Sequence, residues 1–491
     1  MSLRKAVFVW ILLGISVNPL IAQSIGNDLV FDEALYALYH RRADASLAIN
    51  LPDDKTSATT LTVSLMRQRW STPLETKTFE APYRQPLRVS FDLTQREKGN
   101  YFMKAELRRK GDLLTSAVSR MFPYNPSPKV GFDKNGFLLV DGKPFFPIGI
   151  YTLQNRDGGN HDPIMAEAKR AGFNTTVFYA YTPETIAPLL EAAARNGILA
   201  FVYPTIPFSI EGGKNRSDQA VIRDVEIRRD SPALLGWYIV DEPEGIGKAN
   251  EHEVRERYQI IKETDQDHPC SLVIMSPQAA AKYRSCTDVM WIDPYPIPHA
   301  PVTYVSDCVS GAVKAVEKDK PVWCIPQAFD WNVWKTGKVN QVHRPTPEEE
   351  RCMTYLALVH GAKGIIYWAH TASRYYIRDY PDHWEAVKKL AGEMNLLTPA
   401  LLTPSVEGRL TVTPHDAPVD TMVKVHGGST YVFVVNHSNE SREVVFRLKG
   451  LTDGKRITVM FEGRDLYSES DTWKDLFKPL EVHVYRIGGS A

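Results

Sequence analysis

The sequence predicts a multidomain protein in which a central (β/α)8 barrel is flanked by an N-terminal immunoglobulin-like β-sandwich and a C-terminal β-sandwich. The barrel is predicted because apolar runs of strand type alternate with helical patterns between residues 130 and 402. The sandwiches are predicted because residues 25–125 and 405–491 contain short alternating runs separated by polar turns. A chain of 491 residues is also long enough for several domains.

The first 24 residues are predicted to be a cleaved secretory signal peptide. Arg4 and Lys5 give a positive start, and residues 6–15 form an apolar run that is too short to span a bilayer. Ala22 and Ser24 have the small-residue spacing of a cleavage site. We therefore expect a secreted or periplasmic protein without membrane insertion.

The first sandwich is expected to end in a proline-rich linker at residues 123–129. Turn signals at residues 99–100 and 111–112 separate its later strands. A small hairpin is expected after the linker, because Asn-Gly and Asp-Gly turns occupy residues 135–136 and 141–142. This hairpin leads into the first buried strand of the barrel.

The barrel is predicted from eight strand-and-helix units in about 250 residues. Its expected strands are Phe146–Thr152, Thr175–Ala180, Leu199–Pro204, Leu235–Val240, Ser271–Ser276, Val289–Asp293, Val322–Gln327 and Gly364–Ala369. An open doubly wound sheet would alternate in the same way. We favour the barrel because the first strand is followed by YTLQN, without a glycine-rich phosphate loop.

Composition excludes some partners. Lys plus Arg equals Asp plus Glu, with 58 of each, so no net field attracts nucleic acid or anionic lipid. The five cysteines match no zinc spacing, and we interpret them as buried small side chains with at most one disulfide. No metal or cofactor is expected, and oligomeric state and disulfide pairing stay open.

Polar and aromatic residues gather at the C-terminal ends of the predicted strands, where barrel enzymes place their chemistry. The fourth strand, LLGWYIVDEPE, ends in Asp241 and Glu242, and the sixth ends in Asp293. The other ends and the loops that follow them supply Tyr151, Tyr179, Tyr203, Tyr295, Gln327, Trp331, Trp368 and His370. Aromatic rings stack on the apolar faces of sugars, and carboxylates and amides bind their hydroxyls. We therefore predict a carbohydrate partner that these residues contact.

Four segments carry a resemblance to clan A glycoside hydrolases, in particular to exported bacterial members with flanking β-sandwiches. They read GWYIVDEPE, WIDPYP, KPVWCIPQAF and GAKGIIYWAH, within residues 130–400. The resemblance implies a retaining glycosidase whose acid/base matches Glu242. The clan has Asn before its acid/base, where this chain has Asp241. Gln327 stands where the clan places its nucleophilic Glu.

This last departure leaves three alternatives, because a neutral amide cannot act as a carboxylate nucleophile. Asp293 is the second carboxylate, or Asp241 or Asp330 serves instead, or the barrel binds a glycan without cleaving it. We predict a glycoside hydrolase that acts on O-glycosidic bonds, with Glu242, Asp293 and Asp241 as catalytic residues. The alternative is a non-catalytic carbohydrate-binding protein; a barrel lyase or isomerase has only the fold behind it.

Overall fold

The computed structural model describes residues 28–37, 41–67, 72–152, 161–178, 183–204, 218–245, 249–316, 319–334, 343–372 and 375–488. These residues form two compact units, which we describe separately. Unit 1 contains most of the chain up to Phe122, and unit 2 contains Pro123–Ala491 with two short segments, Tyr36–Arg42 and Asp92–Lys98. The predicted signal peptide, residues 1–24, lies outside the described residues.

Unit 1 is a β domain with two sheets, as the sequence predicts. One sheet has the order β1-β2-β5, and the other has the order β4-β3-β6-β7, with β8 paired to β6. The strands are β1 (Leu29–Ala37), β2 (Arg42–Ile49), β3 (Thr59–Met66), β4 (Glu75–Glu80), β5 (Leu87–Asp92), β6 (Gly99–Arg109), β7 (Asp112–Val118) and β8 (Phe122–Tyr124), with a short helix α1 (Asp53–Thr56). Buried and half-exposed residues alternate along β2 and β3, because each strand turns one face to the core.

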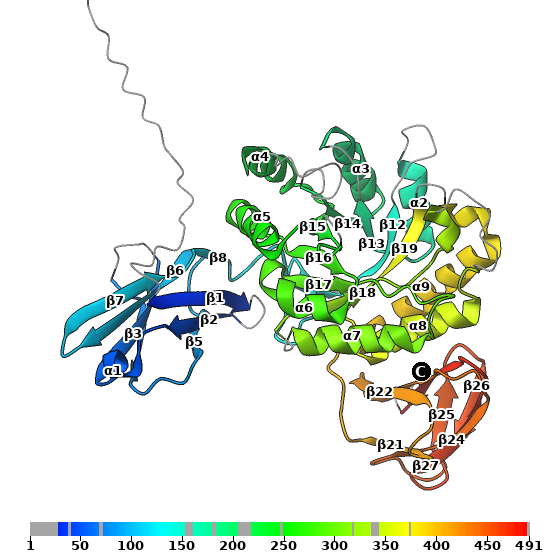
Figure 1. Cartoon of the computed structure of the whole chain (residues 1–491). Helices are drawn as coiled ribbons and strands as arrows, with labels where there is room; N and C mark the ends of the chain where they lie inside the picture. Colours follow the sequence, from blue (N-terminus) through cyan, green and yellow to red (C-terminus); the bar gives the residue numbers. More distant parts are fainter. Residues whose placement is uncertain are drawn as a thin grey trace, which may run out of the picture. The chain divides into compact units, whose positions relative to one another are not determined.

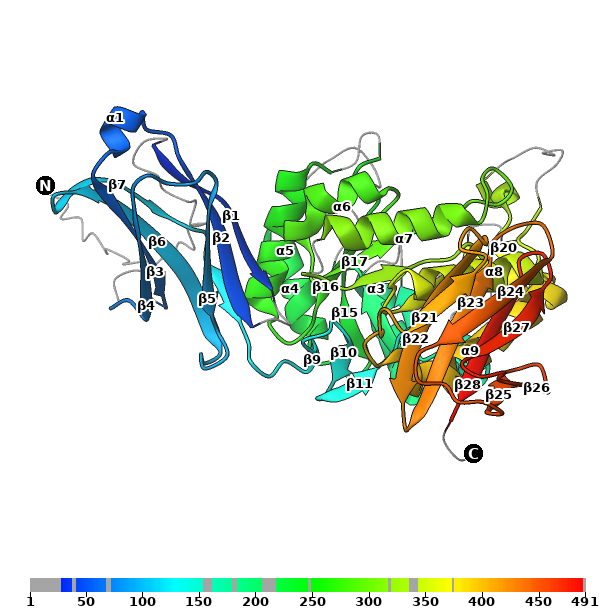
Figure 2. The ribbon, with the colours of Figure 1, turned by 90° about the horizontal axis from the view of Figure 1, so that it is seen from below.

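Unit 2 begins with the predicted hairpin region, a small antiparallel sheet of β9 (Val130–Phe132), β10 (Leu138–Val140) and β11 (Lys143–Phe145). It continues into a closed parallel barrel, which Figures 1 and 2 show from two directions. Its strands are β12 (Ile148–Thr152), β13 (Thr175–Phe178), β14 (Leu199–Val202), β15 (Leu234–Asp241), β16 (Cys270–Ile274), β17 (Val289–Ile292), β18 (Val322–Cys324) and β19 (Ile365–Ala372). Pairing of β12 with β19 closes the barrel. All eight predicted strands are present, and only their ends differ.

A helix follows each barrel strand. The helices are α2 (Asp162–Arg170), α3 (Pro183–Arg195), α4 (Asp218–Arg228), α5 (Glu251–Thr264), α6 (Pro277–Tyr283), α7 (Thr303–Ala315), α8 (Pro347–Val359) and α9 (Pro381–Leu401). Short 3-10 turns occur at η1 (Arg284–Cys286), η2 (Trp331–Trp334) and η3 (Ile377–Asp379), and β20 (Tyr375–Tyr376) pairs antiparallel with β19. Helix α8 begins with a capping box, in which Thr346 and Glu349 bond to each other's backbone N–H groups.

Large aromatic rings fill the interior of the barrel. The rings of Trp291 and Trp323 stack with centroids 5.4 Å apart, and Phe201 packs edge-on against Trp291 at 4.8 Å. Two glycines make room for them. A Cβ on Gly236 would lie 2.3 Å from Phe201 Cε1, and a Cβ on Gly364 would lie 2.9 Å from Trp323 Cδ2. The aromatic core therefore depends on the absence of side chains at these positions.

The C-terminal part of unit 2 is the predicted second sandwich. Its sheets have the orders β21-β24-β27 and β22-β23-β28-β25-β26. The strands are β21 (Leu410–Thr413), β22 (Val419–His426), β23 (Ser429–Asn436), β24 (Arg442–Leu448), β25 (Arg456–Val459), β26 (Arg464–Tyr467), β27 (Thr472–Phe477) and β28 (Val482–Ile487). Inward side chains such as Val432, Phe446 and Trp473 form one buried core between the sheets.

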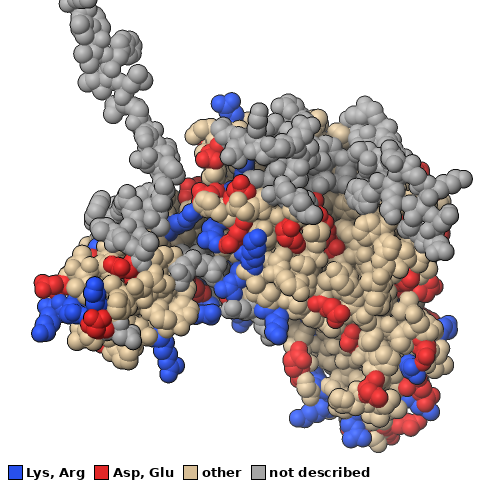
Figure 3. Space-filling model, viewed as in Figure 1, with Lys and Arg blue, Asp and Glu red and all other residues tan. Residues whose placement is uncertain are grey.

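The distribution of charged side chains and the burial of the cysteines agree with the predictions made from composition. On the face drawn in Figure 3, acidic and basic side chains are interspersed over the coloured area. All five cysteines are buried and carry free thiols, so they serve as small packing side chains. Among the described helices, none has both the length and the apolar character needed to cross a membrane.

We expect Gly236→Ala to lower the free energy of unfolding by about 1–3 kcal/mol, because the new methyl group overlaps the Phe201 ring. Gly392 is the matched control. It lies inside α9 with open space around its Cα, so Gly392→Ala should leave stability unchanged or raise it by up to about 1 kcal/mol. Melting temperatures followed by circular dichroism measure both variants. A Gly236→Ala protein as stable as the wild type would contradict this account of the core.

Candidate active site

The end of β15 carries the two adjacent acids, and an irregular register orients them. Tyr238 pairs with Ser271 of β16, whereas Asp241 pairs with Val273, so β15 uses one residue more than its neighbour. Such a bulge reverses the alternation of side chains and brings Asp241 to the face of Tyr238. The Tyr238 hydroxyl donates a hydrogen bond to Asp241 Oδ1 over 2.7 Å. Since the Tyr238 ring packs on Tyr203 inside the barrel, Asp241 also faces the interior.

Glu242 follows in a strained backbone conformation. Its φ of +45° lies in the left-handed region, which a residue with a Cβ adopts at a cost of order 1–3 kcal/mol. Two backbone hydrogen bonds hold it there: Glu242 N donates to Val273 O over 3.0 Å, and Glu242 O accepts from Gly245 N over 2.9 Å. The Glu242 side chain is half-buried and therefore reachable from solvent. Strain of this kind is concentrated at functional positions.

Glu244 fixes the loop after these acids. Its Oε1 accepts hydrogen bonds from Met275 N at 2.6 Å and from Ser276 N at 3.3 Å, which ties the end of β15 to the end of β16. Burial raises the pKa of Glu244 and the charge of Glu242 adds to this, while the backbone hydrogen bonds act in the opposite direction. Sequence reasoning did not single out Glu244 or Tyr238, although both lie within the motif around the two acids.

Asp293 reaches the same place from β17. Trp291 points into the barrel, and Asp293 lies two residues further along, so it shares that face. The residue exposes only 8% of its surface, and its carboxyl group forms a hydrogen bond with the Glu242 side chain. Burial raises the pKa of Asp293 well above its ordinary value, and the charges of Glu242, Asp241 and Glu244 raise it further.

Aromatic residues line one side of these acids. Phe329 lies at the centre of the group, with ring centroids 4.9 Å from Tyr295, 4.7 Å from Trp368 and 5.3 Å from Trp331. Tyr295 and Trp331 are half-buried, so part of each ring is open. Burial raises the pKa of Tyr295 well above its ordinary value, with further contributions from Asp293, Tyr151, Asp241 and Glu242. The aromatic wall, formed by Tyr295, Phe329, Trp331 and Trp368, therefore adjoins the acids.

Three of the other predicted contacts are fully or almost fully buried. Tyr151 and Tyr203 are almost fully buried, and their ring centroids lie 6.4 and 4.4 Å from that of Tyr238, within the barrel interior. His370 is also fully buried, with Nε2 3.4 Å from the Glu167 carboxylate of α2. Each of these three side chains packs against or pairs with other residues, and its contact with a substrate stays a prediction. Tyr179 lies outside the described residues.

Gln327 has a structural role that its sequence position did not reveal. Its side chain is fully buried. The amide Nε2 donates to Ile297 O at 2.8 Å and to Phe329 O at 3.2 Å, while Oε1 accepts from Ile297 N at 2.9 Å. The amide thereby joins the loops that follow β17 and β18. Asp330, another candidate carboxylate, caps its own turn by accepting from Asn332 N at 2.7 Å.

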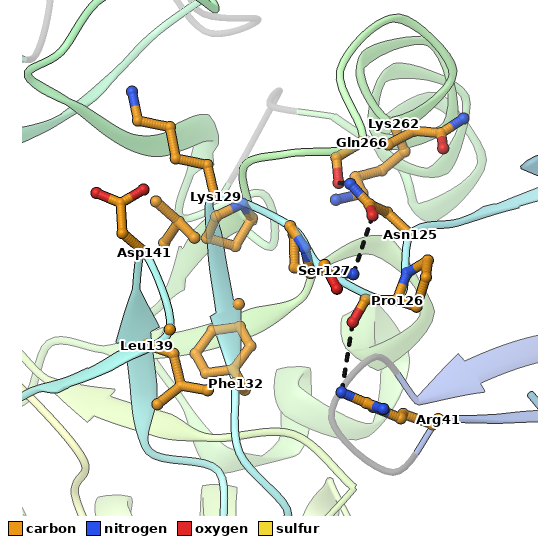
Figure 4. A pocket seen from close by; sticks show the side chains of 15 residues that line it. Arg41, Asn125, Pro126, Ser127, Lys129, Phe132, Leu139, Asp141, Lys262 and Gln266 are labelled. Carbon is orange, nitrogen blue, oxygen red and sulfur yellow. Dashed lines mark hydrogen bonds between the residues drawn. The ribbon is translucent and has the colours of Figure 1, made fainter. Parts of the chain in front are cut away.

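A separate cavity of about 370 Å³ lies at the other end of the strands (Figure 4). It is bordered by the linker around Asn125, by the β9–β11 sheet, and by Gln266 and Pro269, which precede β16. Because the carboxylates lie at the C-terminal ends of the strands, this cavity is not part of the acid cluster. Among the described residues, no group of three or more His, Cys, Asp or Glu is arranged to hold a metal ion.

We expect Gln327→Glu to destabilise the protein by about 1–3 kcal/mol or more, since a carboxylate cannot donate to the buried carbonyls of Ile297 and Phe329. Gln278→Glu is the control, because Gln278 is exposed in the first turn of α6, where a Glu is tolerated. Denaturant unfolding at neutral pH compares the two variants. Equal stability of both variants and the wild type would exclude the structural role of the Gln327 amide.

Solved structures of other proteins share the architecture of this chain. No family model and no curated protein matches the sequence. A solved structure described as a glycoside hydrolase matches with a TM-score of 0.55 and 14% identity, over 74% of this chain and 97% of that chain. A family 5 glycoside hydrolase from Bacteroides vulgatus matches with a TM-score of 0.56 and 15% identity, over 73% and 93%. The chain therefore has the (β/α)8 fold of clan A-like glycoside hydrolases.

Proposed function

We propose that the protein is a glycoside hydrolase that cleaves O-glycosidic bonds of a glycan, with Glu242 as the proton donor. The observation that carries the proposal is the placement of Glu242: strained in its backbone, half-buried, and hydrogen-bonded to the buried Asp293. The barrel fold shared with solved glycoside hydrolases supports it. Because the first 24 residues have the pattern of a signal peptide, we place the substrate outside the cytoplasm, as an extracellular or periplasmic glycan.

The chemistry follows from the groups at the barrel mouth. Cleavage of a glycosidic bond needs a proton on the leaving oxygen, and a carboxylic acid supplies it. Glu242 is the more accessible partner of the Glu242–Asp293 pair, because Asp293 is almost fully buried. Asp241, oriented by Tyr238, is placed to accept a hydrogen bond from a sugar hydroxyl. The aromatic wall provides ring faces for the apolar side of the sugar.

The second candidate is a carbohydrate-binding protein that performs no hydrolysis. Gln327 favours this candidate. The end of the seventh barrel strand, β18, supplies the nucleophile in clan A, but here it holds a buried amide. The strain at Glu242 favours the hydrolase. Sugar binding requires aromatic faces and hydrogen-bonding groups, but it gives no reason to hold two carboxyl groups in contact at a strained position.

We expect Glu242→Gln to reduce turnover of glycosides by about 10²–10⁴-fold, because the amide keeps the size of the side chain but cannot donate the proton. A panel of 4-nitrophenyl glycosides and polysaccharides identifies the substrate, and calorimetry then shows whether the variant still binds it. Glu226→Gln, on the exposed face of α4, should retain wild-type activity. Full turnover by the Glu242→Gln variant would refute the assignment. A wild-type protein that binds glycans without cleaving any would establish the binding function instead.

A further inference from the structure

The contact between Glu242 and Asp293 constrains where a proton resides. An ionised carboxylate only accepts hydrogen bonds, so two carboxyl groups bond to each other only when at least one of them is protonated. Asp293 is the more buried of the two, with 8% of its surface exposed. Its Oδ1 is buried and receives no hydrogen bond from an N–H or hydroxyl group of the described residues. A negative charge on Asp293 would therefore lack the compensation that a buried carboxylate needs.

We propose that Asp293 is a neutral acid that donates a hydrogen bond to the carboxyl group of Glu242, and that it is a positioning residue rather than the nucleophile. This inference rests on the function proposed above and deepens it. It assigns to the second carboxyl group a role other than the acid–nucleophile pairing that the sequence resemblance implies. The general chemistry is known, since a carboxylic acid in an apolar site can remain neutral in order to donate.

The ionisable groups around Asp293 favour its neutral form. The end of β15 contributes three carboxyl groups, namely Asp241, Glu242 and Glu244, whose charges oppose a further negative charge. The groups that sense Asp293 from its own loop, from α7 and from β18 are Tyr295, Tyr304, Cys308 and Cys324. These phenols and thiols are neutral near neutral pH, and burial raises the pKa of each.

The closeness of the two carboxyl groups also argues against an attack by Asp293. A carboxylate pair that flanks a glycosidic bond is separated by about 5 Å in retaining enzymes and by roughly 6.5–9.5 Å in inverting enzymes. Carboxyl groups in hydrogen-bond contact lie closer than either separation, so a sugar does not fit between them. Asp293 therefore lies beside Glu242 as a hydrogen-bond donor, and not on the opposite side of the glycosidic bond.

The Glu242 O–H bond breaks as its proton moves to the leaving oxygen, which also takes the electron pair of the broken C–O bond. Glu242 becomes a carboxylate, and the Asp293 hydroxyl donates to it, which stabilises the charge at the moment it forms. The water oxygen then forms a bond with the electron-deficient anomeric carbon and gives its proton to Glu242, which returns to its neutral form. Asp293 keeps its own proton throughout.

Two substitutions separate a donor from a nucleophile. Asp293→Asn retains an N–H donor, so we expect its kcat on the best 4-nitrophenyl glycoside to remain within about 10-fold of the wild type, whereas Asp293→Ala should lose roughly 10–100-fold more. The split between kcat and KM provides a second readout. The Asp293 donor acts on the charge that forms on Glu242 during the step, so Asp293→Ala should lower kcat while KM changes little, and Asp293→Asn should retain both values. Equal inactivation of both variants, with glycosyl azide formed when azide rescues Asp293→Ala, would show that Asp293 is the nucleophile.

A stability measurement tests the inference without a substrate. A carboxyl group whose pKa is raised by folding stabilises the protein below its ordinary pKa, and this contribution is lost as the pH rises through the folded-state pKa. Asn cannot ionise, so Asp293→Asn should gain stability relative to the wild type as the pH is raised from about 4 to 8. A difference in melting temperature that stays constant with pH would overturn the neutral state of Asp293. Active Glu242→Gln, in contrast, would overturn the proposed function and leave this result standing.

Discussion

One additional residue in β15, between Tyr238 and Asp241, determines how the acids meet. Without the bulge, residues three apart would point to opposite faces of the strand, and Asp241 would be turned away from Tyr238. With it, Asp241 accepts the Tyr238 hydroxyl, and the chain continues into the left-handed conformation of Glu242. The position of Glu242 beside Asp293 then follows from the backbone rather than from the side chains alone.

The strain and the buried charges at this point require a rigid support. The cost of order 1–3 kcal/mol at Glu242, together with a carboxyl group that is buried among other carboxyls, is a considerable fraction of the roughly 5–15 kcal/mol that typically stabilises a domain. Phe201, Trp291 and Trp323 provide this support, because their rings fill the barrel interior next to the acids. Gly236 belongs to β15 itself, so the strand that carries the acids is seated against these rings. Glu244 and Gln327 add polar ties between the loops around the site.

Sequence patterns predicted the architecture well, because buried parallel strands are continuous apolar runs and their helices carry recognisable caps. The inward direction of Asp293 also follows from its spacing after Trp291. The bulge in β15 has no such signature, so the contact between Glu242 and Asp293 was visible only in three dimensions. Tyr151 and Tyr203 were predicted as substrate contacts because they end strands, yet both are buried around Tyr238. The sequence-based prediction and the structure differ most clearly at Gln327. Its hydrogen-bond partners are backbone groups in loops, which a sequence alone does not reveal.

The proposed reaction therefore depends on a single hydrogen bond, between Asp293 and Glu242, in which Asp293 carries the proton. Neutron diffraction from a deuterated crystal at neutral pH would locate that proton directly. We expect a deuteron covalently bound to Asp293 and directed at a Glu242 oxygen, with no water between the two carboxyl groups. Two deuteron-free carboxylates separated by water, at the roughly 5 Å or more expected of a flanking pair, would contradict it.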